Sequence, residues 1–507
     1  MGEYSDILSR RDALQRGLGA AMALVGSSTA ARGGEAPGER GSAPRSTPDQ
    51  PKRTGSRPNI LFAIADDWSW PHAGAYGDEV VKTPVFDRIA REGVLFTHAF
   101  CASPSCTPSR GGILTGQAIH RLEEGGNLWS ILRDKFRVYP DILEAEGYFV
   151  GHMGKGWGPG TLEGSGRTRN PAGPRFETFK QFHESVPEGK PSCFWFGSHD
   201  PHRPYKKGTG LEAGMKTEDV VVPPFLPDTH EVREDIVDYY FEVQRFDSQV
   251  GELVELLETS GQLDNTIVVM TSDNGMPFPR AKANLYDYGT RMPLAIRWPA
   301  RVKGGRTVDE FISFTEFAPT FLQAAGLKPL PEMTGRSFLG LLTGERPERR
   351  TALYLERERH AQVREGDRSY PMRAVRTKQF LYIENLRPNL WPAGDPEKWR
   401  AVGPFGDVDG SPTKRLILDR RDDAEMAKFF RAAFAKRPAE ELYDLSRDPG
   451  QLNNVANRRE YAAVKKRLRA QLIHWMADTE DPRAKGETDF WDRCPYFGKT
   501  SKESGRK

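Results

Sequence analysis

Four short runs of apolar residues, each followed directly by polar residues, dominate the first two thirds of the chain. The runs are 58–65, 148–153, 192–197 and 266–271. Their length fits strands, and apolar residues at consecutive positions are typical of strands buried on both faces of a parallel sheet. Stretches with helical patterning lie between them, at 83–92, 139–146 and 236–257. Strands that alternate with helices predict an α/β fold with a large, mostly parallel central sheet flanked by helices.

The pattern changes after about residue 345. Short strand-like pieces with turns between them follow, at 353–355, 373–376, 380–384 and 441–445, and then a charged helix at 458–479. They predict a smaller C-terminal α+β subdomain with an antiparallel sheet. We therefore expect a large domain at 57–345, the subdomain at 346–492 and a polar tail at 493–507.

The N-terminus has the pattern of a targeting segment. Arg10 and Arg11 precede a modest apolar run, 18–25, and small residues at 27–31. This predicts a twin-arginine-type signal at 1–33, followed by a disordered linker at 34–56 that is rich in Gly, Pro, Ser and Arg. The alternative is a basic disordered tail with a chance Arg-Arg pair. Because the apolar run is far shorter than the ~20 residues of a membrane span, we expect export to the periplasm or outside the cell without an anchor.

Composition excludes several classes of protein. A formal charge of +3 over 507 residues is too small to indicate a nucleic-acid partner. Four cysteines without a CxxC pair argue against a zinc ribbon and against a disulfide scaffold. If one cysteine has a chemical role, at most one disulfide is possible, and the sequence does not require it.

Polar side chains follow each of the four predicted strands. Because the carboxyl ends of parallel strands meet at one edge of a sheet, where ligands bind, we expect these side chains to converge: Asp66, Asp67, Lys155, His199, His202, Asp273 and Asn274. The Asp and Asn oxygens are hard ligands that suit calcium or magnesium. Taken singly, the Asp pair could be a helix cap and Asp-Asn-Gly a turn. Together, each at the end of a buried strand, they favour a metal site.

The segment 106–116 combines a cysteine with a predicted helix start. Pro108 suits the first turn of a helix, so Cys106 would lie at or just before its N-terminus. Backbone N–H groups and the helix dipole favour an anion there, and Arg110 adds a guanidinium that fits tetrahedral oxyanions. The alternative for Cys106 is a buried structural cysteine.

The same segment resembles the signature of the type I sulfatases, Cys-x-Pro-Ser-Arg followed by Leu-Thr-Gly, at Cys106 to Arg110 and Leu114 to Gly116. The resemblance implies an alkaline-phosphatase-like fold, with 57–345 as the catalytic domain. It also implies that a formylglycine-generating maturation enzyme oxidises Cys106 to Cα-formylglycine. It further implies one divalent metal, usually calcium with magnesium possible, with these ligands: Asp66, Asp67, residue 106, Asp273 and Asn274.

The resemblance also implies roles for the remaining polar residues. Arg110, Lys155 and Lys282 would neutralise the sulfuryl oxygens, and His202 would protonate the leaving group while His199 assists. One position departs from the family: many sulfatases carry Lys-x-His where this chain has Lys155-Gly156-Trp157. Either another group, such as His199 or a metal-bound carboxylate, replaces that histidine, or the pocket is arranged differently.

Within the family, the chain is most similar to the heparan N-sulfatases (sulfamidases). The similar segments are 272–279, 284–286, 370–373, 446–449 and 479–482, whereas the loop 120–129 differs. We therefore expect a hydrolase that removes sulfate from a sulfated carbohydrate, with an O-sulfatase for an algal or animal polysaccharide as the alternative.

Arg359 and His360, from the subdomain, are expected to bind substrate, unless they belong to an exposed charge cluster. A phosphatase or phosphodiesterase of the same superfold is disfavoured by Cys106 with its recognition motif and by the lack of a second His-rich ligand set. A glycan-binding protein with unconverted Cys106 stays open. The sequence leaves the oligomeric state open.

Overall fold

The computed structural model describes residues 57–345, 349–397, 403–486 and 488–498. The predicted signal (1–33) and linker (34–56), and residues 499–507 of the predicted tail, lie outside the described residues. The described residues form one compact unit, so the division at 345 stays a prediction.

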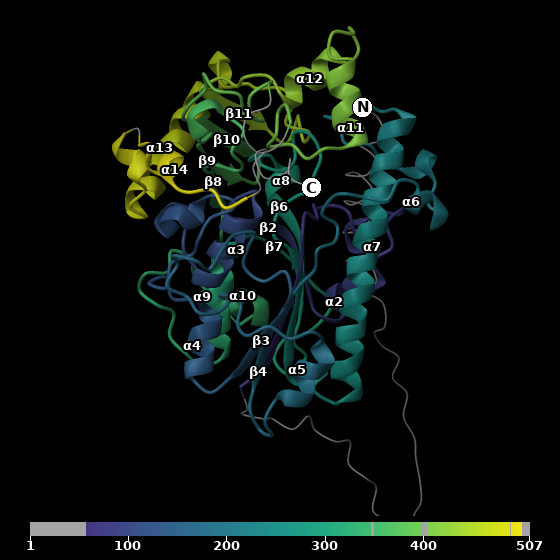
Figure 1. The fold of residues 1–507 in the computed structure, drawn as a ribbon, viewed down its shortest axis with the longest axis vertical. Coiled ribbons are helices and arrows are strands. Elements are labelled where there is room, and N and C mark those ends of the chain that lie inside the picture. Colours follow the sequence, from purple (N-terminus) through teal and green to yellow (C-terminus); the bar gives the residue numbers. More distant parts are fainter. Residues whose placement is uncertain (1–56, 346–348, 398–402, 487, 499–507) are drawn as a thin grey trace, which may run out of the picture. The chain divides into compact units, whose positions relative to one another are not determined.

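A seven-stranded mixed sheet forms the centre of the fold (Figure 1). Its strands are β1 (Asn59–Ala65), β2 (Val94–Phe100), β3 (Phe149–Gly154), β4 (Ser192–Gly197), β5 (Thr266–Ser272), β6 (Arg291–Arg297) and β7 (Arg306–Ser313). They lie in the order β3-β4-β1-β5-β6-β2-β7, and β6 runs antiparallel to both of its neighbours while the other neighbouring pairs are parallel. The four predicted strands are β1, β3, β4 and β5, which lie together, so their carboxyl ends share one edge.

Helices cover both faces of this sheet (Figure 1). Phe62 and Ile64 of β1 belong to one core with helices α3 (Cys106–Thr115), α4 (Tyr139–Ala145), α9 (Phe317–Ala324) and α10 (Leu339–Thr343). Leu61 and Ala63 belong to a second core with α2 (Pro84–Glu92), α5 (Phe179–Ser185) and α7 (His230–Thr259). Neighbouring β1 residues thus enter opposite cores, which explains the uninterrupted apolar run.

A second, four-stranded antiparallel sheet follows in the chain. It comprises β8 (Ala352–Arg357), β9 (Met372–Thr377), β10 (Phe380–Asn385) and β11 (Glu440–Asp444), in the order β11-β10-β9-β8. Val375, Tyr382 and Leu442 pack against α13 (Ala462–Asp478), whereas Leu355 and Leu381 join a core with Phe100 of β2. The predicted fold class is therefore confirmed.

Shorter helices complete the structure. They are α6 (Thr209–Glu212), α8 (Asp287–Thr290), α11 (Pro412–Asp419), α12 (Ala427–Ala433), α14 (Phe490–Arg493) and the 3₁₀ segments Gly74–Tyr76, Ile119–Gly126, Thr217–Asp219, Leu263–Asn265, Phe314–Glu316, Glu365–Asp367, Arg459–Tyr461 and Pro482–Lys485. Within the described part of the chain, no helix is long and apolar enough to cross a membrane.

Candidate active site

Cys106 lies at the start of α3, as predicted from Pro108. Ser105 is the N-cap residue, and the whole helix is buried. The Cys106 thiol lies 3.3 Å from Asp66 Oδ1. Burial, together with the Asp273 and Asp66 carboxylates, raises the pKa of this thiol well above its usual range. A protonated thiol is a poor nucleophile, so the unmodified cysteine is not suited to attack a substrate.

Three carboxylates from two strand ends converge on this thiol. One ligand atom from each member of the group lies within 4.8 Å of the others: Asp66, Asp67, Cys106 and Asp273. Asp66 and Asp67 follow β1 and Asp273 follows β5, its parallel neighbour. Asp67 adopts a positive φ of 81°, which turns its side chain away from the regular strand direction.

Asn274 completes this group. Its Nδ2 donates to Asp67 Oδ1 at 2.5 Å, whereas its buried Oδ1 has no hydrogen-bond partner among the described residues. A buried amide oxygen without a partner costs free energy unless a further group binds it. Hard oxygens clustered around it fit a calcium-like cation, so the residues present suit the predicted metal.

Charges within the cluster shift the carboxyl pKa values in opposite directions. Burial opposes ionisation of Asp66, yet the Lys155 ammonium, 2.6 Å away, lowers its pKa well below the usual range. For Asp67, burial outweighs the nearby cations and, with the Asp66 charge, raises the pKa to about 6. A bound cation would favour the ionised form of Asp67.

Three cations surround the carboxylates. Arg110 Nε donates to Asp273 Oδ2 at 2.7 Å, and its Nη1 donates to the carbonyls of Lys155 and Gly156. Lys155 Nζ donates to both oxygens of Asp66 at 2.7 and 2.6 Å. Lys282 Nζ donates to Asp67 Oδ2 at 2.7 Å. The structure therefore brings together all three predicted anion-binding residues.

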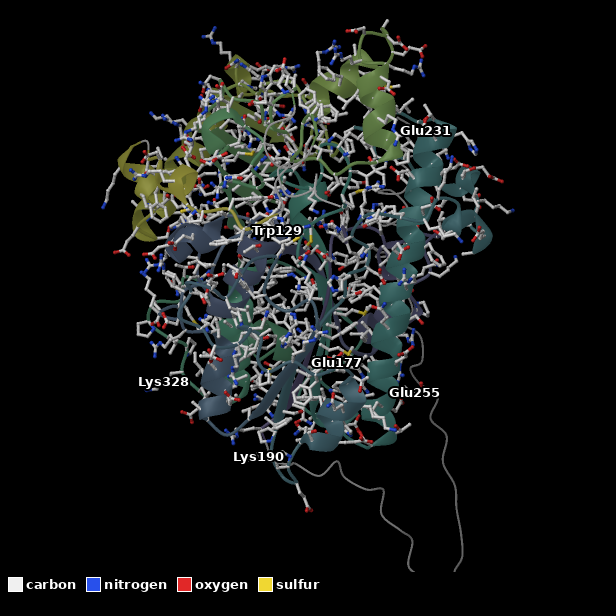
Figure 2. All side chains as sticks on the ribbon, viewed as in Figure 1. Trp129, Glu177, Lys190, Glu231, Glu255 and Lys328 are labelled. Atoms are coloured by element: carbon white, nitrogen blue, oxygen red, sulfur yellow. The ribbon has the colours of Figure 1, made fainter. Side chains whose placement is uncertain are left out.

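His202 lies near the same Asp67 oxygen that Lys282 binds. Its Nδ1 lies 2.6 Å from the Arg203 carbonyl oxygen, which assigns the Nδ1 proton, and its Nε2 lies 3.8 Å from Asp67 Oδ2. His199 and His202 both line a pocket of about 850 Å³ together with Asp66, Lys155 and Trp129. Figure 2 shows Trp129 near the centre of the view, whereas Lys190, which precedes β4, lies at the opposite end of the sheet. The pocket thus opens at the carboxyl ends of the strands.

Trp157 occupies the position where many sulfatases have a histidine. It lines the pocket, is 5% exposed and packs within the core that contains α3. Its Nε1 has no hydrogen-bond partner among the described residues. His199 lines the same pocket, and burial lowers its pKa, which leaves a neutral imidazole able to accept a proton at neutral pH.

The two predicted substrate-binding residues of the subdomain lie in different surroundings. Arg359 is 1% exposed, and its guanidinium donates to the carbonyls of Asp492, Cys494 and Pro495. It thereby anchors the C-terminal segment, away from the carboxylates. His360 Nδ1 lies 2.8 Å from Ser105 Oγ beside Cys106, and burial lowers its pKa to about 3. Both side chains are buried, so the alternative of an exposed charge cluster is excluded.

The sequence reasoning missed one residue of the site. Asp409 Oδ2 accepts a hydrogen bond from Lys282 Nζ at 3.1 Å, and a carboxylate oxygen of Asp409 lies within 4.8 Å of ligand atoms of Asp67 and His202. Asp409 lies in an irregular segment between β10 and α11. No motif or strand end marks it in the sequence, so no local signal pointed to it. The four cysteines (Cys101, Cys106, Cys193 and Cys494) are buried and unpaired.

This geometry agrees with comparisons to known proteins. The family model "Sulfatase" matches residues 58–163 and 174–327, which carry the cluster around Cys106. The chain belongs to the sulfatase family. A second model, "N-sulphoglucosamine sulphohydrolase, C-terminal", matches residues 280–396 of this sulfatase.

Individual relatives agree with this assignment. The chain is 31% identical to human N-sulphoglucosamine sulphohydrolase over 84% of this chain and 91% of that protein. It is 29% identical to an ulvan-active sulfatase of Formosa agariphila, over 84% of this chain and 76% of that one. A solved structure of a protein in complex with its substrate D-glucosamine-2-N,6-O-disulfate matches with a TM-score of 0.60 at 21% identity, covering 85% of this chain and all of that one. The last likeness concerns the fold.

Proposed function

We propose that this sulfatase hydrolyses the sulfamate of an N-sulfated glucosamine in a glycosaminoglycan, using calcium and a Cα-formylglycine formed from Cys106. The observation that carries the proposal is the buried group of Asp66, Asp67, Cys106 and Asp273 within 4.8 Å, beside the unpartnered Asn274 oxygen. Similarity to the human N-sulphoglucosamine sulphohydrolase over most of both chains supports the N-sulfated substrate.

The proposal assigns a role to each group of the site. Asp66, Asp67, Asp273 and Asn274 would hold the cation. When present, the hydrated formylglycine would supply the nucleophilic hydroxyl, and the metal would add positive charge for the sulfuryl oxygens.

Arg110, Lys155 and Lys282 would lie around the transferred group and neutralise charge that develops on its oxygens. As an imidazolium, His202 would donate its Nδ1 proton to the Arg203 carbonyl as a hydrogen bond and would transfer its Nε2 proton to the leaving nitrogen. His199, with its lowered pKa, would accept the proton that other sulfatases transfer through the histidine found at the position of Trp157.

The predicted substrate role of Arg359 is not carried into this proposal, because its guanidinium binds the C-terminal carbonyls.

An O-sulfatase acting on a polysaccharide is the second candidate. The ulvan-active relative covers as much of this chain as the human one does, and the pocket of about 850 Å³ lies within the range of pockets that hold sizeable ligands. Export by the twin-arginine route remains part of the proposal and rests on Arg10 and Arg11 with the apolar run behind them.

The test uses protein produced with and without a formylglycine-generating enzyme. We expect the peptide that contains residue 106 to show the mass difference between a –CH₂SH and a –CHO side chain only with that enzyme. We also expect sulfate release from N-sulfoglucosamine to exceed release from glucosamine 6-O-sulfate and from ulvan oligosaccharides.

Cys106→Ala should abolish this release, whereas Cys494→Ala, a matched change at another buried cysteine, should retain it. If the enzyme prefers an O-sulfated substrate, the function is that of the second candidate, an O-sulfatase. If Cys106 stays unconverted although the maturation enzyme is active, the result favours a glycan-binding protein.

A further inference from the structure

We propose that Asp409 determines substrate specificity: its free carboxylate oxygen accepts a hydrogen bond from a neutral hydroxyl next to the sulfated atom of the sugar and excludes substrates with a second anionic group there. The inference rests on the proposed function, because it assumes that a saccharide sulfate occupies the site around Cys106. It adds the class of sugar that the site accepts.

The first observation is that only one of the two Asp409 carboxylate oxygens makes a hydrogen bond among the described residues. Its Oδ2 binds Lys282 Nζ at 3.1 Å. No hydrogen bond engages Oδ1 within the part of the chain that the structure describes, and the side chain is 29% exposed. Lys282, by contrast, is 4% exposed. The open side of the pair is therefore the carboxylate side, where a ligand can reach an acceptor.

The second observation is the place of this carboxylate in the site. It lies within 4.8 Å of the ligand atoms of His202 and Asp67. Nε2 of His202 is the atom proposed to protonate the leaving atom, and the His202 side chain is 36% exposed. A group that contacts Asp409 would therefore belong to the ring atom next to the one that carries the sulfate.

The third observation is that the Asp409 backbone is held firmly. Two residues earlier, the Asp407 carboxylate accepts hydrogen bonds from Arg357 Nη2 at 2.5 Å and Arg364 Nη2 at 2.6 Å. Lys414 Nζ donates to the carbonyl of Val408 at 2.7 Å. These contacts fix the segment before any ligand binds, which is what a selective contact requires.

Charge then decides which neighbouring substituent fits. A hydroxyl can donate to the free oxygen, and a hydrogen bond to a carboxylate is about twice as strong as a neutral one. A neighbouring sulfate or carboxylate would bring two anions together, a juxtaposition that opposes binding strongly. Asp409 therefore selects saccharides with an uncharged donor beside the scissile sulfate.

The experiment compares full-length wild type, Asp409→Asn and Asp422→Asn, the last being the same change at a 96% exposed position. The probes are N-sulfoglucosamine and N-sulfoglucosamine with a second sulfate on O3. We expect wild type to favour the first probe by tenfold or more in kcat/KM. Asp409→Asn should lower kcat/KM for the first probe by about tenfold and raise it for the second, so that the preference collapses, whereas Asp422→Asn should behave as wild type.

Two results would overturn the inference. If Asp409→Asn lowers kcat/KM for both probes by the same factor, Asp409 only holds Lys282. If the preference is unchanged, Asp409 does not contact the sugar.

Failure of the proposed function is read separately. If wild type hydrolyses an O-sulfated sugar instead, the same ratio is measured with and without a neighbouring sulfate on that sugar. If nothing is hydrolysed, calorimetry measures the affinity of both N-sulfated probes for Cys106→Ala, with and without Asp409→Asn. The ratio of the two affinities then replaces the ratio of kcat/KM values. Equal affinities, or no binding, overturn the inference.

Discussion

Two residues of the site, Asn274 and Asp67, have surroundings that suit the binding of a cation. Asn274 uses its Nδ2 to bind Asp67, yet its carbonyl oxygen is buried without a partner among the described residues. Asp67 is fully buried, and this burial, together with the charge of Asp66, raises its pKa to about 6. Both features cost free energy in the protein alone, and they would become favourable if a divalent ion bound these oxygens, as proposed above.

We therefore expect Asn274→Ala to weaken calcium binding by about tenfold or more, in line with the loss caused by disturbing metal-site ligands and their partners. Isothermal titration of the purified, chelator-treated protein with calcium measures this change. Asn453→Ala, an exposed asparagine, serves as the control and should bind calcium as wild type does. Equal affinity in Asn274→Ala would remove Asn274 from the ligand set.

Helix α2 shows how one element depends on another far away in the chain. Thr83 is its N-cap residue, but the Thr83 side chain makes no capping hydrogen bond. Asp247 of α7 does so instead, accepting from the backbone N–H groups of Val85 at 3.0 Å and Phe86 at 2.8 Å. Burial raises the Asp247 pKa to about 7. The start of α2 is therefore fixed by packing against α7.

Asp247→Ala should lower the free energy of unfolding by about 1–3 kcal/mol, because the buried N–H of Phe86 and the partly buried N–H of Val85 lose their acceptor. Asp247→Asn keeps one acceptor oxygen and should lose less. Glu255→Ala, at an exposed position of the same helix (Figure 2), should be close to neutral. Urea unfolding followed by circular dichroism measures the three values, and equal stability of Asp247→Ala and Glu255→Ala would contradict the capping role.

At the scale of the whole molecule, buried charges connect the second sheet to the rest of the fold. His120, from the segment after α3, lies 2.7 Å from Glu356 of β8 through Nδ1 and 3.0 Å from the Thr479 carbonyl through Nε2. Arg373 of β9 pairs with Glu358 and Asp481 at 2.8 and 2.6 Å. Removing one partner of such a buried pair strongly destabilises a protein, because the other charge is left buried without a partner.

This network predicts a pH-dependent contribution to stability. Burial disfavours charged His120, but the Glu356 and Asp481 carboxylates outweigh it and raise the pKa of His120 above its usual value. A raised histidine pKa contributes stability that is full below about pH 6.5, the unfolded value, and is lost as the pH rises through the folded pKa.

His120→Gln should therefore lower the free energy of unfolding by about 3 kcal/mol at pH 6 and by less at pH 9. Urea unfolding at the two pH values measures the difference. His474→Gln, at a side chain that is 79% exposed on α13, is the control and should show no such trend. An equal loss at both pH values for His120→Gln would contradict the charged pair.

The sequence predicted those parts of the molecule whose cause lies within a few neighbouring residues. Apolar runs identified β1, β3, β4 and β5, and Pro108 located the start of α3 within one residue. The residues at those strand ends were found because parallel strands share an edge. By contrast, β2, β6 and β7 were missed. Thr97 and His98 interrupt the apolar run of β2, Pro293 interrupts that of β6, and Asp309 with Glu310 interrupts that of β7.

Tertiary structure alone decided the features that depend on distant contacts. It placed Asp409 beside Lys282, 127 positions away, and Asp247 at the start of α2. It also directed Arg359 to the carbonyls of the C-terminal segment, although its neighbour His360 reaches Ser105 beside Cys106. Periodicity and turn preferences act over a few positions, so the sequence identified the candidate side chains at strand ends and at the start of a helix. Which of these side chains contact one another depends on long-range packing, which no local pattern encodes.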